Sequence, residues 1–310
     1  MKAMRYHSYG ASDVLAYEET HRPVADAGQV VVRVAATSFN MLDVAIRMGI
    51  LKDVVALTFP HIPNCDMAGV ITEVGAGVHG WKAGDAVLAL LPPDAPGAAA
   101  EYVAAPAEAL AAAPRTVEVA DAAALPLVGL TAWQALFEYA DVRAGQSVLI
   151  NGAGGGVGGY AVQLAVRAGA ATTATAGPRS RDRIRAHGAE RVVDHTAASI
   201  RHAVRGQRFD VVLQLVRTSP EETAQLVELV ADGGTLVSTA TPGPARPGRG
   251  VRVQQVRVRS DAAQLAGLVS RVDAGELAID VADRRPLADL AIVHDRAVAG
   301  QLAGKTVLVP

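Results

Sequence analysis

A strand that runs into a glycine-rich turn and then a helix constrains this chain more than any other feature. The segment is VLINGAGGGVGGYAVQLA, residues 148–165. Its helical part repeats apolar or small residues with the spacing of a buried helix face. Glycines at such a turn let backbone N–H groups at a helix N-terminus approach an anion closely, which is typical of a dinucleotide-binding fingerprint. A flexible linker would not lie between a strand and a periodic helix.

Two registers of the G-x-G-x-x-G spacing fit this turn. One uses Ala153, Gly155 and Gly158, and the other uses Gly154, Gly156 and Gly159. Gly155 would admit the phosphates, and Gly158 would let the helix pack on its strand. The backbone positions predicted to contact the cofactor are Gly152, Ala153, Gly155, Gly156, Val157 and Gly158.

The loop after the next expected strand indicates which dinucleotide binds. Chains that bind NAD place an acidic residue about 20 residues beyond the glycines, whereas arginine suits the 2′-phosphate of NADP. No acidic residue occurs between Asp141 and Asp182, and the loop carries Arg179, Ser180 and Arg181. The sequence therefore predicts NADPH rather than NADH as the cofactor. A solvated basic loop is the alternative interpretation.

The hydrophobic pattern divides the chain into two kinds of structure. Residues 1 to about 115 hold short apolar runs bounded by glycine or proline, typical of a compact, partly barrel-like β domain. From about residue 121, strands alternate with helices, which indicates a parallel α/β sheet. The expected strands are 29–37, 67–74, 85–91, 100–105, 147–151, 171–176, 191–193, 209–215, 235–238 and 305–309, with a helix at 41–48. Ser219, followed by Pro and two Glu, predicts a capping box that opens another helix.

Composition excludes several classes of protein. Twenty-nine basic and 31 acidic residues give a formal charge of −2, so there is no electrostatic signature of nucleic-acid or membrane binding. A single cysteine, Cys65, excludes a disulfide framework and a Cys-rich zinc cluster. The first residues lack the apolar core of a secretory signal, so we expect a cytoplasmic protein.

Several segments together resemble one family. They are GLTAWQALFEYADVRAGQSVLINGAGGGVGGYAVQLAVRAGA (129–170), SFNMLDVAIRMG (38–49), CDMAGVITEVGAGVHGWKAGDAV (65–87), AEYVAAPAEALAAAP (100–114) and GQLAGKTVLV (300–309). The chain resembles the medium-chain dehydrogenase/reductase superfamily, in its zinc-independent quinone oxidoreductase and enoyl reductase branch. The resemblance implies an α/β protein with a GroES-like β-barrel-type domain over 1–118 and 260–310. It also implies a doubly wound Rossmann NADPH-binding domain over 119–259, an active-site cleft between the domains, and a homodimer.

The same resemblance bears on metals. Zinc-dependent relatives hold their metal with two cysteines and a His or Glu, and Cys65-Asp66 stands where they carry a His-Glu pair. One cysteine cannot supply such a site, so we predict no metal and a small buried role for Cys65. A site built from His61, Cys65 and Asp66 is the less favoured alternative.

By resemblance, two residues position the reacting groups at the nicotinamide end, Asn40 and Thr131. His195 would lie near the 2′-phosphate, and Ser238, Thr239 and the loop 240–258 would cover the nicotinamide. The residues leave other roles open: Asn40 also suits an Asx turn before a helix, and Thr131 also suits a helix cap. A solvated charged face is the expectation for Asp43, Arg47, Lys52 and Asp53.

These features predict hydride transfer to a quinone or to the C=C of an α,β-unsaturated carbonyl. Without zinc, oxidation of an alcohol lacks a Lewis acid, whereas an enolate needs only hydrogen-bond donors and water. The proton donor stays open among Tyr6, Tyr9, His294 and Lys305, each of which also suits a structural role. Two alternatives remain, an enoyl reductase for a polyketide-like intermediate and a non-catalytic NADPH-binding protein.

Overall fold

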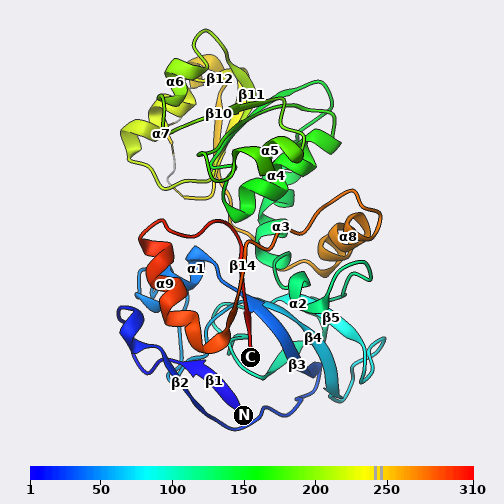
Figure 1. The fold of residues 1–310 in the computed structure, drawn as a ribbon. Helices are drawn as coiled ribbons and strands as arrows, with labels where there is room; N and C mark the ends of the chain where they lie inside the picture. The colour runs from blue at the N-terminus through cyan, green and yellow to red at the C-terminus, as the bar shows by residue number, and fades with distance from the viewer. Residues whose placement is uncertain (241–242, 245–246) are drawn as a thin grey trace. The chain divides into compact units, whose positions relative to one another are not determined.

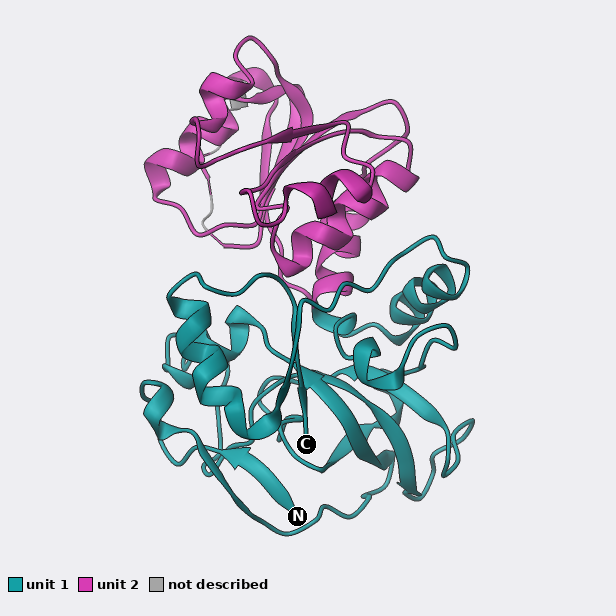
Figure 2. Ribbon diagram, viewed as in Figure 1, with its two compact units in different colours: residues 1–127, 260–310 teal, residues 128–259 magenta. Residues whose placement is uncertain are grey.

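The computed structural model describes residues 1–240, 243–244 and 247–310, and they form two compact units. Unit 1 joins residues 1–127 to 260–310, and unit 2 is the continuous stretch 128–259 (Figure 2). The first boundary lies nine residues beyond the expected one at 118. The reason is local: helix α2 (Val119–Ala122) packs on strands of unit 1, and the Leu127 N–H donates to Asp66 at 2.7 Å.

Unit 1 is a β domain assembled from both ends of the chain (Figure 1). Its strands are β1 (Lys2–Arg5), β2 (Ala16–Glu19), β3 (Gln29–Ser38), β4 (Asp66–Val74), β5 (Ala86–Leu90), β6 (Tyr102–Pro106), β7 (Leu110–Ala112), β14 (Asp283–Pro286) and β15 (Thr306–Val309). Its helices, besides α2, are α1 (Met41–Arg47), α8 (Ala262–Asp273) and α9 (Leu290–Val298). The larger sheet runs in the order β14-β15-β3-β4-β5-β7, and β6 pairs with β3.

Strand β3 organises this unit because it pairs with three strands along its length. It lies antiparallel to β4 and β6, and its last residues pair with β15. Its alternating side chains Val30, Val32 and Val34 enter a core that also contains Met67 and Ile71 of β4. Valine is favoured in such half-buried strands because its branched side chain packs well on a pleated surface.

Unit 2 is a doubly wound parallel sheet. Its strands are β8 (Ser147–Asn151), β9 (Ala171–Thr175), β10 (Arg191–Val193), β11 (Phe209–Gln214), β12 (Val230–Ser238) and β13 (Arg252–Gln255). They run in the order β10-β9-β8-β11-β12-β13, all parallel. This is the Rossmann order, so the predicted fold class is confirmed.

Helices cover both faces of this sheet (Figure 1). They are α4 (Gly156–Arg167) and α5 (Arg181–Ala186) on one face, and α6 (Ile200–Ala203) and α7 (Pro220–Val227) on the other. Ser219 caps α7 through the predicted capping box with Glu222. The chain enters the unit through α3 (Pro126–Trp133), which continues as a π-helical segment, Gln134–Tyr139. Within the described residues, no helix has the length and apolarity needed to cross a membrane.

Candidate functional site

The glycine turn lies at the carboxyl end of β8, where the strand order reverses between β8 and β11. Gly152 has a φ of +92°, which only glycine adopts readily. A Cβ on Gly158 would lie 2.4 Å from Ala153 Cα, so this glycine lets α4 approach the turn. A Cβ on Gly155 would have no described neighbour closer than the Gly152 carbonyl oxygen at 3.5 Å. The register Ala153, Gly155, Gly158 therefore fits the geometry.

The start of α4 suits an anionic group. Gly155 is the N-cap residue and has no side chain to accept from the first turn. The N–H groups of Gly156, Val157 and Gly158 have no acceptor within the helix, because the first turn of any helix leaves its donors unused. These backbone donors and the space at Gly155 are what a dinucleotide pyrophosphate requires. The residues of this turn fit a nicotinamide cofactor.

A buried polar belt lies beneath the turn, across the ends of three neighbouring strands. Asn151 Nδ2 donates to Gln214 Oε1 at 2.6 Å, and the Thr175 hydroxyl donates to Asn151 Oδ1 at 2.8 Å. The Gly152 N–H in turn donates to Thr175 Oγ1 at 2.9 Å. Gln214 therefore helps to fix the turn, a role that the sequence pattern did not reveal.

The structure brings the predicted 2′-phosphate loop beside the glycine turn. A Cβ on Gly154 would lie 2.4 Å from Ser180 Oγ, so Ser180 lies against the turn, and Arg179 is exposed. Arg181, however, forms an ion pair with Asp194 at the end of β10. Sequence reasoning missed Asp194 because it considered acidic residues only as far as the loop after β9. It also missed Arg183, whose guanidinium donates to the Gly154 carbonyl at 2.6 Å.

The remaining predicted cofactor residues of unit 2 follow its other strands. The His195 imidazole lies 3.4 Å from the position of a Cβ on Gly177. Ser238 pairs with Gln214 in the sheet, and the Thr239 N–H donates to the Gln214 carbonyl at 3.0 Å. Of the loop predicted to cover the nicotinamide, residues 241–242 and 245–246 lie outside the described residues.

Thr131 lies inside α3, five residues after the helix begins at Pro126, and it is buried. The alternative that Thr131 caps a helix is therefore wrong. The residues before Thr131, PLVGL, contain a proline and a glycine, which weaken a prediction of helix from sequence. Proline is well tolerated in the first turn of a helix, which is where Pro126 lies.

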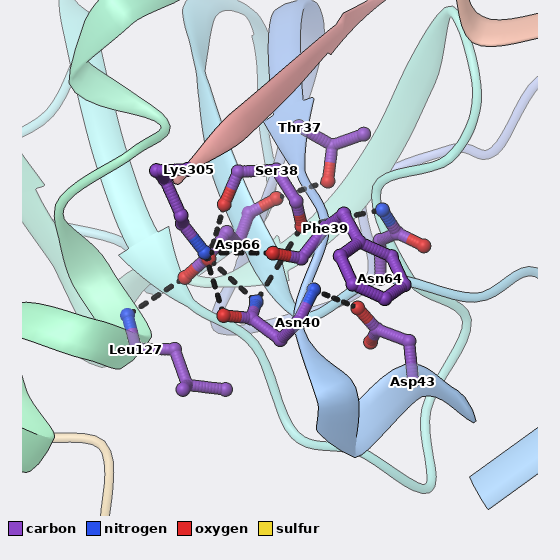
Figure 3. A network of polar contacts seen from close by, with 9 residues as sticks. All are labelled: Thr37, Ser38, Phe39, Asn40, Asp43, Asn64, Asp66, Leu127 and Lys305. Carbon is purple, nitrogen blue, oxygen red and sulfur yellow. Dashed lines mark hydrogen bonds and ion pairs between the residues drawn. The ribbon is translucent and has the colours of Figure 1, made fainter. Parts of the chain in front are cut away.

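Unit 1 holds Asn40 in a buried charged network (Figure 3). Lys305 Nζ donates to Asn40 Oδ1 at 2.6 Å and to the Phe39 carbonyl at 3.0 Å, and it lies 3.1 Å from Asp66 Oδ2. The side chains of Lys305 and Asp66 are 4% and 0% exposed. The three ammonium protons thus have three protein acceptors, and Lys305 has a structural role in this arrangement.

Asp66 is the centre of that network. Its Oδ2 accepts from Ser38 Oγ at 2.5 Å and from Asn40 Nδ2 at 2.8 Å, while its Oδ1 accepts from the Leu127 N–H. The two ends of the Asn40 amide are therefore fixed by partners of opposite character, a donor ammonium and an acceptor carboxylate. This pairing orients Asn40, which is also the N-cap residue of α1 and forms a capping box with Asp43, so the alternative that places Asn40 in a turn before the helix also holds.

Two residues expected on a solvated charged face are buried instead, Asp43 and Arg47, each 2% exposed. Asp43 Oδ2 accepts from the Asn40 N–H at 2.8 Å, and burial raises the pKa of Asp43 to about 7. Arg47 donates to His294 Nδ1 at 3.3 Å and to the Gly10 carbonyl at 2.6 Å. Short-range patterns missed Arg47 because its partners, Gly10 and His294, lie in distant parts of the chain, whereas the partner of Asp43 is the nearby Asn40. Lys52 and Asp53 are exposed, as expected.

The other open proton donors occupy different surroundings. His294 is fully buried, and burial lowers its pKa to about 3, so it is neutral and supports Arg47. The Tyr9 ring packs edge-on against Phe59, with centroids 5.0 Å apart. Tyr6 is fully buried and lines a cavity of unit 1.

The residues considered for zinc do not form a ligand set. Burial lowers the pKa of His61 to about 4 and raises the pKa of the Cys65 thiol, and Asp66 is engaged by Lys305. Among the described residues, no three His, Cys, Asp or Glu side chains gather as a metal site would require. Cys65 is a buried free cysteine, as predicted.

Comparisons with known proteins agree with this architecture. Residues 26–115 match the family model of the alcohol dehydrogenase GroES-like domain, and residues 187–308 match that of zinc-binding dehydrogenases. The chloroplast envelope quinone oxidoreductase homolog of Arabidopsis thaliana is 30% identical over 100% of this chain and 98% of its own length. The NADPH-dependent alkenal/one oxidoreductase of the same plant is 33% identical over 77% of this chain and 62% of its own length.

Solved structures show the same similarity. The quinone oxidoreductase from Coxiella burnetii has a TM-score of 0.89 and 27% identity, covering 100% of this chain and 99% of its own. CurK enoyl reductase has a TM-score of 0.84 and 27% identity, covering 99% and 98%. With its glycine turn, its Rossmann strand order and these relatives, the chain is an oxidoreductase of the medium-chain dehydrogenase/reductase superfamily, in its quinone oxidoreductase branch.

Proposed function

We propose that this protein is an NADPH-dependent, metal-independent reductase of quinones or of the C=C bond of α,β-unsaturated carbonyls. The observation that carries the proposal is the glycine turn, where the space at Gly155 meets the unused N–H groups of α4. The names of the quinone and alkenal/one oxidoreductase relatives support the substrate class.

The loop after β9 supports NADPH over NADH. Arg179 is exposed and Ser180 lies against the glycine turn, so both suit contacts with a 2′-phosphate. Asp194, the acidic residue nearest this loop from the next strand, is paired with Arg181 and accepts hydrogen bonds from Thr196. Its charge is therefore already compensated.

The proposed reaction requires the protein mainly to bind and orient the cofactor and the substrate. Bound NADPH supplies a hydride, which adds to the β-carbon of an enone or to a quinone. Negative charge then develops on the substrate carbonyl oxygen, where hydrogen-bond donors stabilise it, and water supplies the proton. The protein binds the pyrophosphate with the backbone of the glycine turn, and Lys305 and Asp66 keep the Asn40 amide in one orientation.

Metal independence rests on the same network. Asp66 Oδ2 already accepts from an ammonium, a hydroxyl and an amide, so a cation would have to displace Lys305. We expect NADPH oxidation to survive dialysis against a chelator. Loss of activity that returns only with added Zn²⁺ would contradict this part of the proposal.

A panel of quinones and enones tests the reaction itself. NADPH oxidation with at least one of them is the expected result, and no oxidation with any electrophile would refute the proposed reaction. Tight NADPH binding without hydride transfer would instead indicate a non-catalytic NADPH-binding protein.

Single and double replacement of Arg179 and Arg181 by alanine tests the cofactor. We expect the double variant to bind NADPH at least tenfold more weakly and NADH almost unchanged, because Arg179 would lose a charge-assisted contact worth ~1.5–3 kcal/mol and Asp194 would lose the ion pair that compensates its charge. Arg185→Ala is the control, since Arg185 is exposed on the same helix and pairs with Asp182. Equal losses for both dinucleotides would remove the 2′-phosphate assignment.

A dedicated enoyl reductase is the second candidate, because CurK enoyl reductase aligns over nearly the whole chain. Efficient turnover of a bulky or thioester-linked enone, beside poor turnover of simple quinones, would favour it. We also propose a homodimer, which sedimentation velocity would measure directly.

A further inference from the structure

The loop 215–218 follows β11 and lies against the glycine turn. β8 and β11 pair in parallel, and the Leu215 N–H donates to the Asn151 carbonyl at 3.0 Å, so the two strands end side by side. A Cβ on Gly152 would lie 2.6 Å from Val216 Cγ2, so the loop approaches the turn closely. The strand order reverses between these two strands, and open parallel sheets bind ligands outside the carboxyl ends of their strands at that point. The loop therefore borders the position where the glycine turn would hold a ligand.

The side chain of Gln214 holds this loop in place. Gln214 is 0% exposed, and its Nε2 donates to the Val216 carbonyl at 2.9 Å and to Thr218 Oγ1 at 2.8 Å. Its Oε1 accepts from Asn151 Nδ2 at 2.6 Å, which joins the loop to the belt beneath the glycine turn. The two anchored residues lie on either side of Arg217. The backbone of Arg217 is therefore fixed beside the turn, while its side chain is exposed.

Arg217 carries a charge that the protein does not compensate. Its guanidinium makes no hydrogen bond or ion pair with any residue that the structure describes. Two arginines after β9 differ in this respect, since Arg181 forms an ion pair with Asp194 and Arg183 donates to the Gly154 carbonyl. A guanidinium presents five N–H donors in a planar fork that matches the geometry of phosphate oxygens. Arg217 therefore has these donors available to an anionic ligand.

The order of the strands indicates which part of a dinucleotide Arg217 would meet. β9 and β11 flank β8, so the loop with Arg179 and Ser180 and the loop with Arg217 lie on opposite sides of the glycine turn. The turn itself, with the space at Gly155 and the unused N–H groups of α4, suits the pyrophosphate. Since the 2′-phosphate is proposed to lie on the side of Arg179, the phosphate group nearest Arg217 is the pyrophosphate.

We propose that Arg217 binds the pyrophosphate of the dinucleotide, together with the N–H groups of α4. The proposal rests on the dinucleotide binding of the proposed function, and it adds a charged side chain to a site otherwise formed by backbone. NADPH and NADH both carry this pyrophosphate, so Arg217 strengthens the binding of both by the same factor. Arg179, in contrast, is proposed to contact the 2′-phosphate, which NADH lacks.

Arg217→Gln and Arg217→Glu test the contact, because the two replacements have the same shape and differ in charge. Isothermal titration calorimetry measures the Kd of NADPH and NADH for wild type and both variants. We expect Arg217→Gln to weaken both cofactors about tenfold, since a charge-assisted contact to phosphate is lost, and Arg217→Glu to weaken them further. Arg167→Gln and Arg167→Glu are the matched controls, at an exposed arginine in the last turn of α4, and should bind both cofactors like wild type.

ADP-ribose separates this proposal from the reductase function, since it has the pyrophosphate but neither the nicotinamide nor the 2′-phosphate. A loss of ADP-ribose binding by the same factor as NADPH supports the contact, even if no substrate is reduced. Because Arg217 is exposed and unpaired among the described residues, its variants should melt at the same temperature as wild type.

Three results would overturn the contact: unchanged binding in Arg217→Gln, equal losses in the two Arg217 variants, or a loss confined to NADPH. NADPH oxidation by wild type beside any of these results would leave the reductase function intact. A wild type that binds none of the three ligands would overturn the contact and the proposed function together.

Discussion

Lys305 and Asp66 illustrate how far one residue's role depends on a partner that the sequence does not indicate. The two are 239 residues apart, and both are almost fully buried. Burying two charges costs more than the pair regains unless further hydrogen bonds satisfy them, and here Ser38, Asn40 and the Leu127 N–H do so. Removing one partner leaves the other charge uncompensated.

Lys305→Met should therefore destabilise the protein by about 3–5 kcal/mol, measured by urea unfolding. The double variant with Asp66→Asn should be more stable than Lys305→Met alone, because no buried charge remains. Lys82→Met, at an exposed lysine, is the control. A loss of less than about 1 kcal/mol in Lys305→Met, the range of a surface pair, would contradict the role assigned to the network.

Asp43 should make the stability fall as pH rises. Burial raises its pKa from 3.8 to about 7 in the folded protein, so the folded state holds a proton that the unfolded state has released. The free energy of unfolding then decreases between pH 4 and pH 7, by an amount on the order of 4 kcal/mol from this group. Asp43→Asn should gain stability relative to wild type at pH 8 and little at pH 4, in denaturant titrations at both values. A difference independent of pH would show that Asp43 ionises freely.

At the scale of elements, the sequence predicted the strands, turns and helix caps whose signal lies in the spacing of neighbouring residues. The glycine turn, β8 and the capping box at Ser219 follow from a few neighbouring residues, and the structure places them as expected. Strands β1, β2, β7, β13 and β14 were not expected, and each has only three or four residues, although β10 and β15 are as short and were expected. Such short strands are defined by their partners, as β14 is by β15.

The residues of the candidate site likewise divide into those that the sequence could predict and those that it could not. The glycine turn could be predicted because its chemistry lies within one segment. The belt of Asn151, Thr175 and Gln214 could not, because it forms only when three strands pair side by side. Asp194 was not predicted for the same reason, because its ion pair with Arg181 forms only where the ends of neighbouring strands meet.

Two glycines of the turn should respond differently to alanine. Gly158→Ala should lower the melting temperature, because its Cβ would lie 2.4 Å from Ala153 Cα and force α4 away from the turn. Gly155→Ala should fold normally and bind NADPH at least tenfold more weakly, since its Cβ enters space that only a ligand would use. Differential scanning calorimetry and NADPH titration measure the two effects. Normal NADPH binding by a folded Gly155→Ala variant would contradict the placement of the cofactor.

At the scale of the molecule, unit 1 depends on the pairing of segments from both ends of the chain. β15 pairs with β3 on one side and with β14 on the other, and Lys305 immediately precedes it. Unit 2 is a continuous stretch with its own core around Leu149, Val212 and Leu236. The two units therefore differ in what they need in order to fold.

Deleting residues 304–310 should unfold unit 1 selectively. The deletion removes β15 and Lys305, which exposes the edge of β3 and leaves Asp66 uncompensated. Hydrogen exchange should show lost protection in β3 and β4 and retained protection in β8 and β11. Uniform loss of protection across both units would show that unit 2 cannot remain folded without unit 1.

The position of Lys305 also has a consequence for synthesis on the ribosome. Asp66 is made 239 residues before its partner, so the nascent chain carries an unmatched carboxylate while the whole of unit 2 is translated. At about 5–20 residues per second, this interval lasts on the order of 10–50 seconds. Unit 2 has time to fold first, whereas unit 1 can complete its sheet and pair Asp66 only after Lys305 and β15 have been made.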